Sequence, residues 1–155
     1  MHPIILTAAL IGVVLTSSAA FADGEACTLI TQAQVSAALG IPVDAGTPIS
    51  RPGTCQWIGK GKFATLTIIQ PRDGKSPIDS FKAGKASTMP GITVEPVSGV
   101  GDDAYYVYFS NTTRAGVGLV VKKGSSAFEI RVYGFDLDKA KPVAKTLCQA
   151  VAGKL

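Results

Sequence analysis

Histidine is almost absent from this sequence. The only one, His2, lies at the very start of the chain, in a segment that we expect to be removed. A chain without imidazole cannot use Ser-His-Asp or Cys-His nucleophile activation, imidazole acid-base catalysis, or histidine-ligated zinc or copper. An enzyme built from this sequence would have to depend on carboxylates, lysine or tyrosine.

Cysteine is also scarce, with three residues at Cys27, Cys55 and Cys148. Three cysteines allow three alternative disulfide pairings and leave one thiol over, and the spacing alone does not choose between them. A disulfide is possible only if the chain is exported to an oxidising compartment.

The first 22 residues resemble an export signal. Residues 4–15 are apolar except for Thr7 and Gly12, and small residues follow, ending in Ala-Phe-Ala at 20–22. This pattern predicts cleavage after Ala22 and a periplasmic or secreted location, with no stable membrane span after cleavage. The alternative is an uncleaved anchor, because the apolar stretch can be extended to Ala22.

A lipid anchor is not expected at the first cysteine. The residues before Cys27 are Gly24-Glu25-Ala26, and a lipoprotein signal requires small apolar residues there. The charged glutamate therefore argues against lipidation.

Charge is low and nearly balanced. The 15 Lys and Arg residues and the 11 Asp and Glu residues all lie in 23–155 and leave a net charge of +4. The basic residues are scattered, so the concentrated basic stripe of a nucleic-acid-binding protein is missing, and we expect no nucleic-acid partner. With no repeat, linker or low-complexity tract, residues 23–155 are predicted to form a single domain.

Residues 99–133 contain three consecutive runs that alternate in the manner of half-buried strands. The runs, 104–110, 115–123 and 126–133, are separated by short turn-forming segments, which predicts an antiparallel meander. Alternation places one set of side chains on the core face, namely Tyr105, Val107, Phe109, Val117, Leu119, Val121, Phe128, Ile130 and Val132. The opposite face would carry Tyr106, Tyr108, Gly116, Gly118, Glu129, Arg131 and Tyr133.

Helix signals are complete near the amino end of the domain. Thr31 and Gln34 have the spacing of a capping box, Ile30 and Val35 that of a hydrophobic staple, and Gly40 supplies a left-handed stop. A short helix ending at Gly40 is therefore expected.

The remaining segments complete the pattern. Residues 54–58 and 63–70 predict a β-hairpin, 77–87 a short helix with Pro77 at its first position and Phe81 as its anchor, and 92–97 a further strand. The terminal helix is expected at about 139–152, with Asp136 or Asp138 as its cap. Asp138 would place Pro142 in the first turn, where its missing N–H costs little. The predicted fold class is α+β, a mainly antiparallel sheet of about five to six strands packed against N-terminal, middle and C-terminal helices.

The most interesting surface is the face that carries Tyr106 and Tyr108. If Gly116 and Gly118 lie beside the two tyrosines, they leave a trough between aromatic rings. The tentative ligand-binding set is Tyr106, Tyr108, Gly116, Gly118, Glu129 and Arg131. The alternative is that a helix or loop covers this face and that the glycines only make room for the tyrosines.

Other candidates favour structural roles. Asp102 and Asp103 could bind a divalent cation, but a tight turn with carboxylates bonded to backbone N–H groups fits them better, so no metal site or cofactor is predicted. Trp57 shares a strand face with Cys55, as expected of a core residue. Four lysines, at 60, 62, 122 and 123, lie at hairpin ends, where charge normally protects sheet edges, with anion binding as the alternative.

Three short motifs carry a resemblance to a known group. They are Cys27-x-Leu-Ile-Thr, Cys55-x-Trp57 and Gly99-x-Gly-Asp-Asp-Ala104. With them the chain resembles small exported or lipid-anchored bacterial domains of unknown function, best known as mycobacterial-type lipoproteins, and it is more distantly similar to sandwiches of the photosystem P-protein type. The resemblance implies a disulfide between Cys27 and Cys55, which leaves Cys148 as a buried free thiol.

The resemblance also implies a ligand- or partner-binding module with no catalytic residues to carry over. We therefore expect a non-catalytic accessory module of the cell envelope that binds an unknown small ligand or an envelope protein. The alternatives are a structural or protein-interaction envelope protein and, last, a histidine-independent enzyme. Such an enzyme would need two of Asp102, Asp103, Glu129 and Tyr108 to converge in a cleft.

Overall fold

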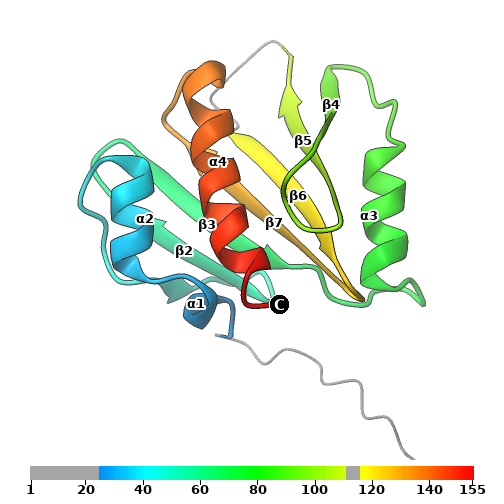
Figure 1. Ribbon diagram of the computed structural model, residues 1–155, viewed down its shortest axis with the longest axis horizontal. Coiled ribbons are helices and arrows are strands. Elements are labelled where there is room, and N and C mark those ends of the chain that lie inside the picture. Colours follow the sequence, from blue (N-terminus) through cyan, green and yellow to red (C-terminus); the bar gives the residue numbers. More distant parts are fainter. Residues whose placement is uncertain (1–24, 111–115) are drawn as a thin grey trace, which may run out of the picture.

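The computed structural model describes residues 25–110 and 116–155 (Figure 1). The predicted signal segment 1–22, its cleavage after Ala22 and the predicted turn at 111–114 lie outside the described residues. The strands form one antiparallel sheet in the order β1-β2-β3-β7-β6-β5-β4. They are β1 (Thr47–Pro48), β2 (Thr54–Ile58), β3 (Phe63–Ile68), β4 (Ile92–Val97), β5 (Asp103–Phe109), β6 (Val117–Lys123) and β7 (Ser126–Tyr133). The helices are α1 (Ala26–Leu29), α2 (Gln32–Leu39), α3 (Pro77–Lys85) and α4 (Leu137–Ala152).

This architecture confirms the predicted α+β class. Six of the seven strands match the predicted segments, and the seventh is β1, which has only two residues in a stretch rich in proline and glycine. The predicted meander is β5-β6-β7, and the predicted hairpin is β2-β3. The pairing of β3 with β7, with Leu66 opposite Ile130, joins the hairpin to the meander.

Helices α1, α2 and α4 cover one face of the sheet, and α4 crosses its middle in Figure 1. We call this the helix face. Its core contains the predicted apolar residues of β6 and β7, including Leu119 and Ile130, together with Trp57 and Leu147. The predictions for those strands and for Trp57 are thereby confirmed.

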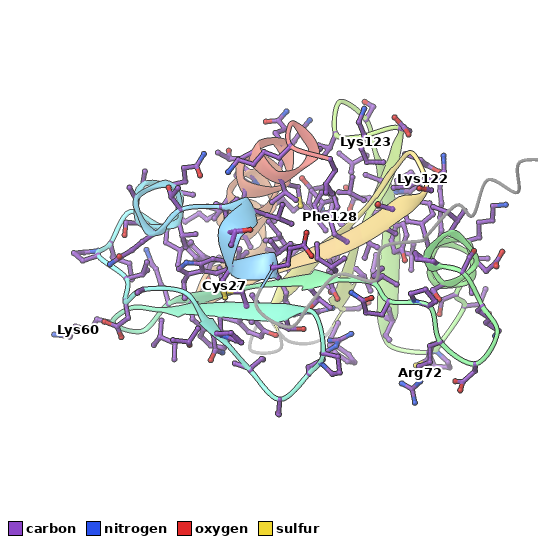
Figure 2. All side chains as sticks on the ribbon, turned by 90° about the horizontal axis from the view of Figure 1, so that it is seen from below. Cys27, Lys60, Arg72, Lys122, Lys123 and Phe128 are labelled. Carbon is purple, nitrogen blue, oxygen red and sulfur yellow. A yellow bond between two sulfur atoms is a disulfide. The ribbon has the colours of Figure 1, made fainter. Side chains whose placement is uncertain are left out.

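Helix α3 lies against the other face, at the β5 end of the sheet (Figure 1). Its anchor Phe81 is buried and packs with Tyr105, Val120 and Ala127. Figure 2 shows the sheet nearly edge-on, with α1, α2 and α4 on one side of it and α3 away from them. None of the described helices covers the β2-β3 side of this second face, which we call the open face.

The predicted start and end of α2 and the predicted start of α3 are confirmed. The Thr31 side chain accepts a hydrogen bond from the Gln34 N–H while the Gln34 side chain accepts one from the Thr31 N–H, and Gly40 ends α2 at φ 68°. Helix α3 begins with Pro77 in its first turn, as expected, and Ser76 and Asp79 form a second capping box. Satisfying both otherwise free N–H groups explains why such short helices begin where they do.

Helix α4 begins earlier than predicted. It starts at Leu137 with Asp136 as its N-cap, so the first of the two predicted caps is confirmed, and the start at about residue 139, which assumed Asp138 as the cap, is wrong. Pro142 consequently lies inside the helix rather than in its first turn. Its ring nitrogen has no hydrogen to donate to the carbonyl of Asp138, and the packing of the apolar face, with Ala144 and Leu147 buried, outweighs that loss.

The predicted facing of β5 is wrong. Tyr106 lies opposite Leu119 and belongs to the main core, so Tyr106 and Tyr108 point to the helix face. Tyr105 and Val107 point to the second face instead. Helix α4 covers one side of β5 and α3 covers the other, and residues 104–109 are apolar at every position. Without an alternation of apolar and polar residues, the sequence does not indicate which side chains face which layer.

Both edges of the sheet resist pairing with another strand. At one edge β1 is only two residues long. At the other, the Ser110 N–H donates to the Gly91 carbonyl, and the alternation of an antiparallel ladder then turns the backbone groups of Ile92, Val94 and Pro96 outward. Pro96 has no N–H, and the Ile92 N–H is already bonded within its turn. Short length and proline are common means of protecting an edge strand.

The disulfide implied by the resemblance is present. Cys27 and Cys55 are bonded, with their Cα atoms 5.1 Å apart, and the bond ties α1 to β2. Cys148 on α4 is a buried free cysteine, as expected. In the described part of the chain, no helix has the length and apolar character needed to cross a membrane.

Candidate functional site

The six residues of the predicted binding surface separate into two groups on opposite faces of the sheet. Tyr106 and Tyr108 lie on the helix face, where Tyr106 is only 5% exposed. Gly118, Glu129 and Arg131 lie on the open face. The prediction that all six form one outward surface is wrong, because it depended on the incorrect phase of β5.

The two tyrosines form a polar cluster with Glu95 of β4 and Lys141 of α4, which we call the Lys141 cluster. The Tyr108 hydroxyl and the Lys141 ammonium both donate to Oε2 of Glu95, over 3.0 and 2.6 Å. The ammonium also lies 5.0 Å from the ring centre of Tyr108 and 5.6 Å from that of Tyr106. The four groups satisfy one another, and they join the edge strand to the helix.

Electrostatics in the Lys141 cluster favour the ion pair. The hydrogen bond from Lys141 holds the pKa of Glu95 below its ordinary value, with a smaller contribution from Tyr108. Desolvation acts to lower the pKa of Lys141, but the bond and charge of Glu95 outweigh it and raise that pKa. Both groups therefore stay charged over a wide range of pH.

The second group lies at the centre of the open face. Thr65 of β3, Arg131 of β7 and Gly118 of β6 form one row across three strands. Phe63 and Tyr133 lie opposite each other in the neighbouring row. We call this set the open-face cluster, and it comprises Phe63, Thr65, Gly116, Gly118, Glu129, Arg131 and Tyr133.

An ion pair fills the space above Gly118. Nε and one terminal nitrogen of Arg131 both donate to Oε1 of Glu129, over 3.0 and 2.6 Å, and the two side chains are 21% and 14% exposed. A Cβ atom at position 118 would collide with Oε1 of Glu129 and approach Arg131 and Val107 to 2.9 Å. The predicted glycine trough thus exists in the backbone, but the chain's own ion pair occupies it.

Gly116 makes room for a different tyrosine from those predicted. A Cβ atom there would come within 2.7 Å of the Tyr133 ring, and the backbone has φ 73°, which favours glycine. On the other side, the Tyr133 ring stacks on Phe63 with centroids 4.0 Å apart and planes 10° apart. Tyr133 is therefore held rigidly on the open face.

Several charged and polar groups surround the hydroxyl of Tyr133. Burial raises the pKa of Tyr133, Arg131 opposes that rise and Glu129 adds to it. A hydrogen bond with Thr65 and, least of all, the charge of Arg51 also oppose the rise in this pKa. Arg51 lies in the turn between β1 and β2.

The remaining candidates serve the fold. Asp102 accepts a hydrogen bond from the Gly124 N–H at 2.7 Å, and the pKa of Asp102 is lowered mainly by that bond. Asp103 pairs instead with Lys85 at 2.7 Å. The two carboxylates thus bind separate partners, and the described residues hold no group of three or more potential metal ligands.

The hairpin lysines do not form one patch. Figure 2 shows Lys60 at the opposite end of the molecule from Lys122 and Lys123. Lys62 donates to the carbonyl of Leu39 at the end of α2, and Lys123 pairs with Asp102.

Sequence reasoning missed Tyr133, Phe63 and Thr65 as members of the open-face cluster. The sequence predicts the correct face for Tyr133, but the neighbours of Tyr133 come from β3, and nothing in the local pattern indicates that β3 pairs with β7. Glu95 and Lys141 were missed for the same reason, since they lie 46 residues apart and meet only through the fold.

No family model matches this chain, and neither the curated proteins nor the solved structures contain a significant match.

Proposed function

We propose that this chain is an exported, non-catalytic accessory module of the cell envelope that binds a partner protein through the open face of its sheet. The observation that carries the proposal is the composition of that face. A stacked aromatic pair and an arginine ion pair lie side by side there, and none of the described helices covers them.

The residue types on the open face are those that favour recognition. Tyrosine and arginine are enriched among the residues that contribute most to binding energy at protein interfaces. Tyr133 and Arg131 are both half-buried and fixed by neighbours, so little side-chain entropy would be lost on binding. Ile58, which is 48% exposed, extends the apolar part of the surface beside Phe63.

The blocked edges of the sheet also support a face-on mode. A partner that adds a strand needs a row of free backbone N–H and C=O groups along an edge. The two-residue β1 and the outward Pro96 of β4 leave little of such a row. Recognition through side chains on the open face is the mode that remains.

The positions of the acidic and phenolic groups favour binding over catalysis. Asp102, Asp103, Glu129 and Tyr108 were the residues that an enzyme would have to combine, and they bond to Gly124, Lys85, Arg131 and Glu95 respectively. Each has its own partner in a separate part of the fold.

Site-specific photo-crosslinking in the native envelope would test the proposal. Benzoylphenylalanine in place of Ile58 should give a discrete adduct that excess unmodified protein competes away. The matched control places the same group at Lys139, which is exposed on α4 on the opposite side. Identical adducts from both positions, or none from Ile58, would contradict the proposal.

A further inference from the structure

We propose that α3 is a lid, which opens while the rest of the domain stays folded and thereby exposes an apolar cluster that continues the open face. The cluster consists of Tyr105 of β5, Val120 of β6 and Ala127 of β7, all of them buried in the closed state. The lid is a property of the fold and does not depend on the identity of the proposed partner.

A single side chain anchors α3 to the sheet. Of the nine residues of α3, all of them described, only Phe81 is buried, and its ring centroid lies 5.2 Å from that of Tyr105. Helix α4, by contrast, buries several residues, among them Leu147 and Cys148. A helix as short as α3 is unstable in water by itself, so the Phe81 contact is what keeps it in place. Local opening of α3 therefore costs far less free energy than unfolding of the whole domain.

The connections of α3 to the sheet are exposed on both sides. Residues 71–76 lead into the helix and residues 88–91 lead out of it, and all of them are exposed. A Cβ atom at Gly74 or Gly91 would meet no atom within 4 Å, so neither connection is tightly packed at these points. Figure 1 shows α3 at one margin of the sheet, apart from α1, α2 and α4. The connections thus place little restraint on a movement of the helix.

A single ion pair acts as a latch at the end of α3. Among the described residues, Lys85 and Asp103 form the one ion pair between α3 and the sheet, with Nζ 2.7 Å from Oδ2. The two side chains are 35% and 39% exposed, and an ion pair in such a position is weak and is screened by salt. Closure of the lid should therefore weaken as the ionic strength rises.

The surface beneath α3 adjoins the open-face cluster. Val120 lies opposite Glu129, which belongs to that cluster, and Ala127 precedes Glu129 by two residues on β7. Opening of α3 joins these apolar side chains to the open face without any change in strand pairing. The lid thereby controls how much apolar surface this side of the sheet presents.

Hydrogen exchange of residues 23–155, with the disulfide intact, tests the lid. Relative to their intrinsic rates, the amides of α3 should exchange at least about a hundredfold faster than those of α4. Low concentrations of urea should hardly change the exchange of α3, because local opening exposes little surface, and should accelerate that of α4 through global unfolding. Equal protection of the two helices, or the same dependence on urea, would overturn the lid.

Variants of the latch are compared on the same helix. Lys85→Met should accelerate the exchange of α3 by about two- to fivefold and should abolish its acceleration by salt. Lys82→Met removes the same charge from α3 at an exposed position that forms no ion pair with a described residue of the sheet, and it should change the rate by less than about twofold. Equal effects of the two variants would overturn the latch.

Phe81→Ala removes the anchor and is the decisive variant. The amides of α3 should then exchange within about tenfold of the rates of an unfolded chain, while those of α4 and β7 stay protected. If α4 loses protection to the same extent as α3, then α3 is part of the cooperative core and the lid is overturned. Unchanged protection of α3 would overturn it as well, because Phe81 would not be what holds the helix.

Discussion

The Tyr106 hydroxyl donates a hydrogen bond to the main-chain carbonyl of Lys141 over 3.0 Å. The bond joins β5 to α4 at the margin of the main core. Burial raises the pKa of Tyr106, so the hydroxyl remains protonated and able to donate at any physiological pH. A tyrosine predicted to face a ligand thus holds a helix on the sheet.

Replacing Tyr106 by Phe should lower the free energy of unfolding by about 1 kcal/mol, since the ring still fills its site and only the hydrogen bond is lost. Urea unfolding followed by circular dichroism measures the change. Tyr108→Phe is the matched comparison. Its hydroxyl bonds a partly exposed carboxylate that Lys141 also holds, so its loss should be smaller. A larger effect of Tyr108→Phe would contradict this account of the two tyrosines.

Replacing Gly118 by Ala should break the ion pair of Glu129 and Arg131. A methyl group would occupy the position of the Glu129 carboxylate, and we expect a loss of about 1 to 3 kcal/mol in unfolding free energy from overpacking. Partner binding should fall as well, because Arg131 is displaced. Gly153→Ala is the control, since the nearest atom to its Cβ would be 3.6 Å away. If both variants unfold at the same urea concentration, the ion pair does not occupy the space above Gly118.

The parts of the fold that could be predicted from the sequence are those governed by local chemistry. Thr31 and Gln34 mark a helix start because both capping bonds lie within one turn. Strand β7 could be oriented because the charged residues Glu129 and Arg131 alternate with apolar ones. The hairpin β2-β3 followed from its polar, glycine-containing turn.

The parts that could not be predicted depend on contacts between distant segments. In β5, Tyr105 and Tyr106 are chemically alike, and only α3 and α4 decide which of them faces which layer. The start of α4 depended on whether Asp136 or Asp138 caps it, and packing placed Pro142 within the helix. The candidate site was half predicted, since Gly116, Gly118, Glu129 and Arg131 do share a face, while Phe63 and Thr65 join them through the pairing of β3 with β7.

Reduction of the Cys27–Cys55 disulfide should destabilise the domain by about 3 to 4 kcal/mol, because the open chain regains the entropy of a loop with a sequence separation of 28. Urea unfolding of a Cys27→Ala, Cys55→Ala variant measures the loss.

The free thiol of Cys148 should react only after unfolding. The thiol is buried and its pKa is raised by burial, so a thiol reagent should label this one cysteine in the unfolded protein and none in the folded protein. Rapid labelling of the folded protein would show that α4 does not hold Cys148 against the sheet.

The ion pair of Glu95 and Lys141 should make the domain sensitive to acid. The folded-state pKa of Glu95 is lowered by Lys141, so the pair contributes fully above the ordinary pKa of 4.5. This contribution is lost as the pH falls below 4.5 and through the lowered pKa, where the folded protein must take up the proton. At high pH the sign is opposite: the pKa of Lys141 is raised, so its contribution is complete below 10.5 and disappears as the pH rises through the raised pKa.

Unfolding free energies of wild type and Glu95→Gln, measured by urea from pH 2.5 to 7 in steps of about half a unit, isolate this effect, because the other carboxylates contribute equally to both curves. The difference should be largest near neutral pH and should vanish in acid. Lys141→Met should give the same profile, and the double variant should add little, with a coupling energy of about 0.5 to 1 kcal/mol at pH 7 for a partly exposed pair. A difference curve that stays constant down to pH 2.5 would mean that the Glu95 carboxylate is not stabilised by Lys141, and that β4 is held to α4 by apolar contacts alone.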